Sequence, residues 1–387
     1  MTTRRTKVLI LFGTRPEAIK MAPIIKEFRR RKKFFKITVC VTAQHREMLD
    51  RALEIFNIKP DYDLNLMRPN QTLPELTSRI LDGVTRIIET EKPDWIFVQG
   101  DTTTTFASAL AAFYQKIKIV HVEAGLRTGN KYSPFPEEIN RRLTSHLADI
   151  HFAPTKIAEK RLTSEGFSRD SIFVTGNTVI DALKWIVEKQ DRPTRIKKLK
   201  KFFLTKYKIS FPKDVKTILV TGHRRENFGD GFLRICSALS RIAKRNNDIQ
   251  IVYPVHLNPN VQKPVYFFLG ELKNVHLIEP LDYEPFVFLM KSSYIILTDS
   301  GGIQEEAPFL GKPILVLRDT TERPEGIVAH TAKLIGTDEN RIVKELELFL
   351  KNASEYKKMA KATNPYGNGN SADTIVNIFK NKVVKGR

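Results

Sequence analysis

Acidic residues near the middle of the chain are the first candidates for chemistry. In HVEAGLRTGNKYSPFPEEINRR, residues 121–142, Glu123 follows an apolar run, and Glu137 and Glu138 open the next helical pattern. Asp101 directly follows another apolar run, WIFVQG. Carboxylates brought together repel one another, which raises some pKa values toward the range of general acids and bases. They could instead hold a divalent cation, or serve locally as helix caps and dipole partners.

Cations and glycines follow other apolar runs. GTRPEAIK begins with Gly13, which permits a tight turn, and sets Arg15 and Lys20 at a helix start, where backbone N–H groups favour an anion. A glycine turn with two solvated cations explains this motif equally well. In the second half, GHRRENFG sets His223 and Arg224 just past an apolar run, which suits a diphosphate.

The sharpest signal is LTDSGGIQEEAP. Ser300, Gly301 and Gly302 open a predicted helix directly after a predicted strand, so their backbone N–H groups form an anion site. Glu305 and Glu306 follow one turn later and can accept hydrogen bonds from a ribose diol. The G-x-G-x-x-G fingerprint and the P-loop are both absent from the sequence, which argues against a dehydrogenase and an NTPase.

Apolar runs that alternate with amphipathic stretches must position these residues. The predicted strands span residues 7–12, 36–43, 95–100, 118–124, 150–154, 171–176, 217–223, 249–256, 275–281, 294–299 and 313–319. Such strands, separated by helices, form a parallel sheet covered on both faces. Ligands bind at the carboxyl ends of the strands, where the candidate residues lie. We predict an α/β fold with two doubly wound, Rossmann-like domains facing a central cleft.

Length and local composition set the predicted domain boundaries. A chain of 387 residues is too long for one hydrophobic core. We place an N-terminal domain at residues 1–177 and a nucleotide-binding domain at residues 178–370. The last helix, residues 371–387, is expected to pack on the N-terminal domain. In the first predicted helix, Pro23 is expected to cause a kink or an early break.

Composition limits the class of protein. Hydrophobic residues make up 41% and charged residues 28%, which is typical of a soluble globular protein. The sequence lacks an apolar run of about 18 residues, and its first apolar run is too short for a signal peptide, so we expect a cytoplasmic protein. Cys40 and Cys236 lie in apolar patterns and are predicted to be small core residues, with neither a disulfide nor a metal site.

The charge balance is strongly positive. Lys and Arg number 64 against 43 Asp and Glu, a net charge of +21, which attracts anions. The basic runs at residues 29–33 and 195–208 lack RNA-binding or zinc-finger patterns and indicate solvated helix faces. We therefore predict no nucleic-acid partner and no membrane partner, with a polyanion-binding protein as an alternative class.

Taken together, the motifs resemble one family closely. GTRPEAIK, GDTTTT, VEAGLRTGN with SPFPEEINRR, GHRRENFG, PVHLNP and SGGIQEEAPFLGKPILVLRDTTERPE occur in the order found in the non-hydrolysing UDP-N-acetylglucosamine 2-epimerases. The resemblance runs from about residue 7 to about residue 380. It implies a glycosyltransferase-B-type fold and a homodimer. It also implies interconversion of UDP-N-acetylglucosamine and UDP-N-acetylmannosamine with no metal and no nicotinamide cofactor.

The resemblance also implies roles for single residues. Asp101, Glu123 and Glu137 match the catalytic carboxylates of the family. The residues that match the nucleotide site are Phe286 near the base, Glu306 on the ribose, and Ser300, Gly301, Gly302 and His223 on the diphosphate, assisted by Arg15 and Lys20. His223 is counted with the catalytic residues because the diphosphate is the leaving group. Which carboxylate faces C2 stays open.

Bacterial members of the family often bind a second UDP-N-acetylglucosamine molecule as an activator. The segments TAQHREM, RPNQT, HRR and PVHLNP match its contacts, and the matching residues are Gln44, Gln71, Arg224 and His256. Glu47 stands where a glutamine is expected, so a charge replaces a neutral amide.

Two other enzyme classes share this architecture. A hydrolysing epimerase would release free N-acetylmannosamine and would use the same nucleotide residues. A retaining nucleotide-sugar glycosyltransferase depends on its donor clamp, and the neighbouring carboxylates argue against that class.

Overall fold

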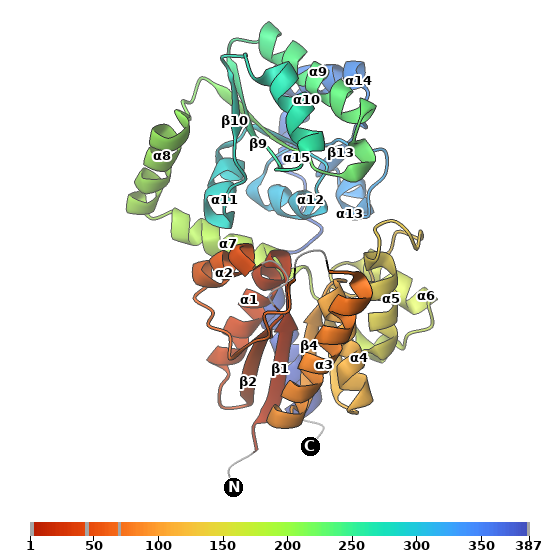
Figure 1. Cartoon of the computed structure of the whole chain (residues 1–387). Coiled ribbons are helices and arrows are strands. Elements are labelled where there is room, and N and C mark those ends of the chain that lie inside the picture. The colour runs from red at the N-terminus through yellow and green to blue at the C-terminus, as the bar shows by residue number, and fades with distance from the viewer. Residues whose placement is uncertain (1–3, 43–45, 69–70, 385–387) are drawn as a thin grey trace. The chain divides into compact units, whose positions relative to one another are not determined.

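The computed structural model describes residues 4–42, 46–68 and 71–384, and Figure 1 shows its elements. The chain forms two compact units, each described here by itself. The N-terminal unit comprises Met1–Ala182 and Tyr366–Arg387, and the C-terminal unit comprises Leu183–Pro365. The boundaries thus follow residues 182 and 365, whereas the sequence suggested residues 177 and 370.

Within its described residues, the N-terminal unit contains one sheet of seven parallel strands in the order β3-β2-β1-β4-β5-β6-β7. The strands are β1 (Thr6–Phe12), β2 (Phe35–Val41), β3 (Tyr62–Asp63), β4 (Trp95–Gln99), β5 (Lys118–Val122), β6 (Ile150–Ala153) and β7 (Ile172–Val174). The helices are α1 (Arg15–Arg30), α2 (Arg46–Ile55), α3 (Leu73–Glu91), α4 (Thr103–Tyr114), α5 (Glu137–Leu147), α6 (Lys156–Ser164), η1 (Arg169–Ser171) and α16 (Ser371–Val384). Helix α7 (Thr178–Gln190) crosses the boundary at residue 182.

Strand β4 shows why both faces of this sheet are covered. Ile96 and Val98 belong to the cluster that β1 forms with α3 and α4, the helices labelled beside β1 and β4 in Figure 1. The alternate residues, Trp95 and Phe97, contact Phe379 of α16 edge to face. Successive strand residues point to opposite faces, so a strand that is apolar throughout requires helices on both sides.

Helix α1 is continuous through Pro23, and the early break expected at that residue does not occur. Thr14 caps the helix and forms a capping box with Glu17. An interior proline costs about 3 kcal/mol because it removes a backbone hydrogen bond. Burial of Ile24, Ile25 and Phe28 beyond the proline offsets this cost, since each such side chain contributes about 1.5–3 kcal/mol.

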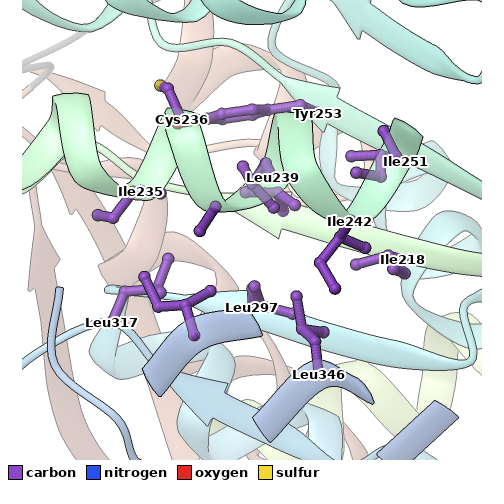
Figure 2. Packing of buried hydrophobic residues seen from close by; sticks show 14 of the residues in the cluster. Ile218, Ile235, Cys236, Leu239, Ile242, Ile251, Tyr253, Leu297, Leu317 and Leu346 are labelled. Carbon is purple, nitrogen blue, oxygen red and sulfur yellow. The ribbon is translucent and has the colours of Figure 1, made fainter. Parts of the chain in front are cut away.

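The C-terminal unit, whose residues 183–365 are all described, contains a parallel sheet in the order β10-β9-β8-β11-β12-β13. The strands are β8 (Lys216–Thr221), β9 (Ile249–Pro254), β10 (Val275–Ile278), β11 (Ile295–Thr298), β12 (Ile314–Val316) and β13 (Ala332–Leu334). The helices are α8 (Pro193–Tyr207), η2 (Arg225–Asn227), α9 (Asp230–Arg245), α10 (Pro259–Leu269), α11 (Tyr283–Ser292), α12 (Gly301–Glu306), η3 (Ala307–Leu310), α13 (Pro324–Val328), α14 (Glu339–Lys351) and α15 (Ala353–Ala360). Figure 2 shows the core of this unit, where Leu239 and Ile242 of α9 pack among Ile218, Leu297 and Leu346.

Two doubly wound, Rossmann-like units confirm the predicted fold class. Every predicted strand overlaps an observed one, whereas β3 and β13 were not predicted. Cys40 and Cys236 are both fully buried free thiols, as predicted, and burial raises the pKa of each thiol to about 12. Across the described residues, no helix is both long and apolar enough to cross a membrane.

Candidate active site

Glu123 and Asp101 lie at the carboxyl ends of neighbouring strands. Strand β4 pairs with β5 in a register that sets Gln99 opposite Val122. Glu123, the residue after β5, has a positive φ of 64° and is 8% exposed. Its Oε2 accepts hydrogen bonds from Lys20 Nζ at 2.5 Å and from Gln99 Nε2 at 2.6 Å. The sequence associated Lys20 with a diphosphate, whereas here its ammonium forms an ion pair with a candidate catalytic acid.

Asp101 is held through its side chain and its backbone. Arg141 Nη2 donates to Asp101 Oδ2 at 2.5 Å, and Asn140 Nδ2 donates to the carbonyl oxygen of Asp101 at 3.0 Å. His121 Nε2 donates to the carbonyl oxygen of Gly100 at 2.8 Å. Burial lowers the pKa of His121 to about 3, so this imidazole is neutral and donates from Nε2. Helix α5 and strand β5 therefore fix the loop that carries Asp101.

The two glutamates of the PEE motif have different environments. Glu138 is fully buried and accepts hydrogen bonds from the backbone N–H groups of Thr128 and Gly129 at 3.0 and 3.3 Å. It also forms ion pairs with Arg141 at 3.4 Å and Arg142 at 3.1 Å. Glu138 therefore stabilises the loop before α5. Glu137, the first residue of α5, is partly exposed and remains the candidate for chemistry.

Arg15 is the first residue of α1 and directly follows the loop between β1 and this helix. Glu17, in the first turn, was not predicted as a site residue. Its side chain is buried and accepts hydrogen bonds from the backbone N–H groups of Gly13 and Thr14. The T-x-x-E spacing of a capping box is the sequence signal that could have identified it.

In the C-terminal unit, His223 is fixed by Asp299, a residue that the sequence analysis missed. Strands β8 and β11 are neighbours, and these two residues follow their carboxyl ends. Asp299 is fully buried, and its Oδ2 accepts hydrogen bonds from the backbone N–H groups of His223 and Arg224, both at 2.8 Å. The imidazole Nδ1 of His223 lies 3.3 Å from Asp299 Oδ1. The exposed ring of His256 stacks against that of His223, with 5.6 Å between the ring centroids.

The SGG motif follows β11, with Ser300 as the cap of the short helix α12. A Cβ on Gly301 would lie 2.9 Å from Glu322 Oε1, so a side chain there would require Glu322 to shift. A Cβ on Gly302 would meet only the Ser300 hydroxyl, at 3.9 Å. The backbone at Gly302 is therefore the more open of the two.

The acids of α12 have partners within the same unit. Tyr283 donates its hydroxyl hydrogen to Glu306, and Arg323 Nε donates to Glu305 at 2.8 Å. Phe286, on α11, is partly buried. Both carboxylates are buried, Glu306 beside the Tyr283 hydroxyl and Glu305 in its ion pair with Arg323.

Three arginines surround one further carboxylate, Glu322. Its oxygens lie 3.2 Å from Arg224, 2.6 Å from Arg318 and 3.4 Å from Arg323. Desolvation acts to raise the pKa of Glu322, but the charges of Arg323, Arg318 and Arg224 outweigh it and lower the pKa to about 2. This cluster keeps the arginines beside the SGG motif in place.

The residues matched to an activator site are only partly visible. Gln44 lies outside the described residues. Gln71, before α3, accepts hydrogen bonds from the backbone N–H of Arg68 at 3.1 Å and from the side chain of Arg79. Arg224 and His256 have the contacts given above, with Glu322 and His223. Among the described residues, no group of three or more His, Cys, Asp or Glu side chains has an arrangement that could hold a metal ion.

Comparisons with known proteins identify the family. The family model for UDP-N-acetylglucosamine 2-epimerase matches residues 26–380, and the chain belongs to this family. It is 57% identical over 375 residues to UDP-N-acetylglucosamine 2-epimerase of Escherichia coli K12, covering 97% of this chain and 98% of the relative. The Campylobacter jejuni enzyme of the same name is 55% identical over 383 residues, 98% of each chain.

A solved structure supports the same conclusion. The crystal structure of UDP-GlcNAc 2-epimerase from Neisseria meningitidis, bound to UDP-GlcNAc, superposes with a TM-score of 0.91 at 53% sequence identity. The similarity covers 97% of this chain and 99% of that one. The resemblance found in the motifs is thereby confirmed.

Proposed function

We propose that this protein interconverts UDP-N-acetylglucosamine and UDP-N-acetylmannosamine by inverting C2, without hydrolysing the sugar nucleotide. The observation that carries the proposal is the pair Asp101 and Glu123 on neighbouring strand ends, where Asp101 forms an ion pair with Arg141 and Glu123 with Lys20. Family membership and the named activity of the relatives support the substrate. By resemblance, the enzyme works in the cytoplasm as a homodimer and needs neither a metal nor a nicotinamide.

The chemistry requires the C1–O bond to UDP to break before the C2 proton is removed. No carbonyl group acidifies the C2 proton, so its direct removal is difficult. When the C1–O bond to UDP breaks, positive charge develops at C1 and the C2–H bond becomes acidic. A carboxylate takes the C2 proton, and the C–H electron pair forms the C1–C2 double bond of 2-acetamidoglucal. Protonation of C2 on the opposite face and return of UDP to C1 complete the inversion.

In this proposal, the acids of the N-terminal unit move the protons. Asp101, Glu123 and Glu137 supply the groups that accept and return hydrogen at C2, since each follows a strand or opens a helix at the same edge of the sheet. Positioned acid–base groups typically contribute about 10²–10⁴-fold in rate. Lys20 and Arg141 set the orientation of two of these carboxylates through the ion pairs.

The C-terminal unit holds the nucleotide in this proposal. Phe286 lies against the uracil and Glu306 accepts hydrogen bonds from the ribose, in place of or together with Tyr283. The diphosphate binds His223 and the backbone of Ser300, Gly301 and Gly302, with Arg15 and Lys20 as further cations. Donors directed at the departing diphosphate stabilise the charge that develops as the bond breaks, at about 3 kcal/mol for each donor.

Solvent deuterium incorporation tests the mechanism. The enzyme is incubated with UDP-N-acetylglucosamine in heavy water, and the products are followed by NMR. We expect deuterium at C2 in both epimers, because the abstracted proton exchanges with solvent before it returns. Chromatography of the same mixture distinguishes the hydrolysing alternative. Free N-acetylmannosamine as the main product would reject our proposal.

Neutral replacements test the roles of the three acids. We expect Asp101→Asn, Glu123→Gln and Glu137→Gln each to bind UDP normally but to lose about 10²–10⁴-fold in kcat. The measurements are steady-state epimerisation and calorimetric titration with UDP. Glu89→Gln, which changes an exposed acid on α3, is the matched control and should keep full activity. Near-normal turnover in one of the three variants would remove that residue from the mechanism.

A further inference from the structure

Glu17 joins two loops that lie next to candidate site residues. Its Oε2 accepts hydrogen bonds from the backbone N–H groups of Gly13 and Thr14, at 3.0 and 2.7 Å. Its Oε1 lies 2.7 Å from the hydroxyl oxygen of Thr102 and 3.1 Å from that of Thr105. One side chain therefore connects the β1–α1 loop to the start of α4.

Both loops matter for the proposed reaction. The β1–α1 loop leads into the helix that carries Arg15 and Lys20. Thr102 directly follows Asp101 and is the N-cap of α4. The contact with Glu17 therefore acts on the peptide next to a candidate catalytic acid.

A helix cap alone does not explain this arrangement. Helix α3 begins with the same capping box, in which Thr72 N–H donates to Glu75 Oε2 at 2.7 Å. Glu75, however, is exposed, and within the part of the chain that the structure describes its side chain hydrogen-bonds to Thr72 of its own box. Glu17 is 2% exposed and uses its second oxygen on a segment 85 residues away. Glu75 is thus a natural control for the capping function.

Close packing at the same junction supports a fixed geometry. A Cβ on Gly13 would lie 2.2 Å from Thr42 Oγ1 and 2.4 Å from Thr104 Oγ1. These two hydroxyl oxygens are themselves 2.9 Å apart and hydrogen-bonded. The loops after β1, β2 and β4 therefore meet with no space for a further atom, and a displaced loop cannot relax locally.

Two threonine hydroxyls face Oε1 of Glu17. Thr102 donates to this oxygen at 2.7 Å, and the hydroxyl oxygen of Thr105 lies 3.1 Å from it. The Thr105 hydroxyl also donates to the carbonyl oxygen of Gln99 at 2.6 Å, at the end of β4. Burial raises the pKa of Glu17, although hydrogen bonds from Thr102, Thr14 and Gly13 oppose the shift.

We propose that Glu17 is a positioning residue, whose carboxyl group holds the Asp101 loop against the loop that leads to Arg15 and Lys20. This inference rests on the proposed epimerase function for its catalytic consequence. The structural part of it, the connection between the two loops, does not depend on the substrate.

Four variants test the role of Glu17 by steady-state kinetics with UDP-N-acetylglucosamine. We expect Glu17→Ala to lower kcat about 100-fold with little change in KM, since displacement of about 1 Å near the chemistry costs that much. Glu17→Gln, whose amide oxygen can face the two N–H groups and whose NH₂ can face the hydroxyls, should restore kcat to within about fivefold of wild type. Thr102→Val should lower kcat about tenfold, and Glu75→Ala should leave it unchanged.

Several results would overturn the proposal. Equal losses in Glu17→Gln and Glu17→Ala would show that Glu17 takes part in proton transfer, and unchanged kcat in Glu17→Ala would show that the connection is irrelevant. Should Glu17→Ala not fold, Glu17→Gln and Thr102→Val decide the question, and normal kcat in Thr102→Val overturns the proposal.

Hydrogen exchange separates this inference from the proposed reaction. In Glu17→Ala, the backbone amides of residues 102–106 should exchange faster than in wild type, whereas in Glu75→Ala they should not. An inactive wild-type enzyme would reject the epimerase proposal and leave this readout intact. Unchanged exchange in Glu17→Ala would reject the connection whatever the activity.

Discussion

At the scale of single residues, Glu322 shows how one buried acid can organise several cations. Its carboxylate is 8% exposed and contacts Arg224, Arg318 and Arg323. Removal of a buried partner leaves charges uncompensated and typically costs about 3–5 kcal/mol. Glu322 and Arg323 also lie next to Gly301, so their placement bears on the candidate anion site as well as on stability.

The low pKa of Glu322 predicts a pH-dependent stability. Its pKa is about 2 in the folded protein against 4.5 ordinarily, so the stabilisation is complete above about pH 5 and is lost as the pH falls toward 2. From this difference, we expect Glu322 to contribute about 3 kcal/mol at pH 7 and about 1 kcal/mol at pH 3. Urea unfolding of wild type and Glu322→Gln at the two pH values measures this change.

A matched control sharpens that measurement. Glu188→Gln, at an exposed position on α7, should change the free energy of unfolding by less than about 0.5 kcal/mol at either pH. If the difference between wild type and Glu322→Gln were the same at pH 3 as at pH 7, the ionised form of Glu322 would not be the source of the stability.

Sequence reasoning identified the acids but not the cations that hold them. Asp101 and Glu123 follow apolar runs, and runs of this kind become neighbouring parallel strands, so their proximity could be predicted. The ion pair of Glu123 with Lys20 joins residues 103 positions apart, and such a contact depends on side-chain directions that the sequence does not show. Asp299 was missed although it ends a strand, the same position that identified Asp101.

At the scale of elements, helix α16 packs against one face of the sheet of the N-terminal unit. Its Phe379 contacts Phe28, Phe35, Trp95 and Phe97, with ring centroids 4.9–5.8 Å away. The start of the helix is fixed by Asp181, which accepts hydrogen bonds from the N–H groups of residues 371 and 372. The end of the chain is therefore part of the core of the N-terminal unit.

Truncation of Phe379 tests this role. We expect Phe379→Ala to lower the free energy of unfolding by about 3–5 kcal/mol, because it leaves a cavity among four aromatic rings. Phe113→Ala, at the exposed end of α4, should cost less than about 1 kcal/mol. Urea unfolding compares the two. Similar losses in both variants would contradict a core function for α16.

Strands with an apolar run could be predicted, and strands without one could not. Strand β3 consists of Tyr62 and Asp63 and β13 of Ala332, Lys333 and Leu334, so a polar residue interrupts each and no apolar run stands out. Pro23 was expected to interrupt α1 because local propensity disfavours an interior proline. Packing of the following residues against the sheet outweighs that propensity, and only the tertiary structure reveals this.

At the scale of the whole molecule, each unit has its own sheet and its own core. The chain contains two tryptophans, and they fall in different units. Trp95 lies on β4 in the N-terminal unit, and Trp185 lies on α7 within the C-terminal unit. The variants Trp185→Phe and Trp95→Phe therefore each report on the unfolding of one unit by fluorescence.

Addition of UDP should stabilise the two units unequally. If the C-terminal unit holds UDP as proposed, a concentration of 100 times Kd stabilises that unit by about 2.7 kcal/mol. For a unit of this size, we expect the melting temperature reported by Trp185 to rise by about 5–10 °C. The transition reported by Trp95 should move by less, since the residues proposed to hold the uridine belong to the C-terminal unit. A larger shift at Trp95 than at Trp185 would show that the nucleotide binds the N-terminal unit, against the proposal. Equal shifts would show that the two units unfold together.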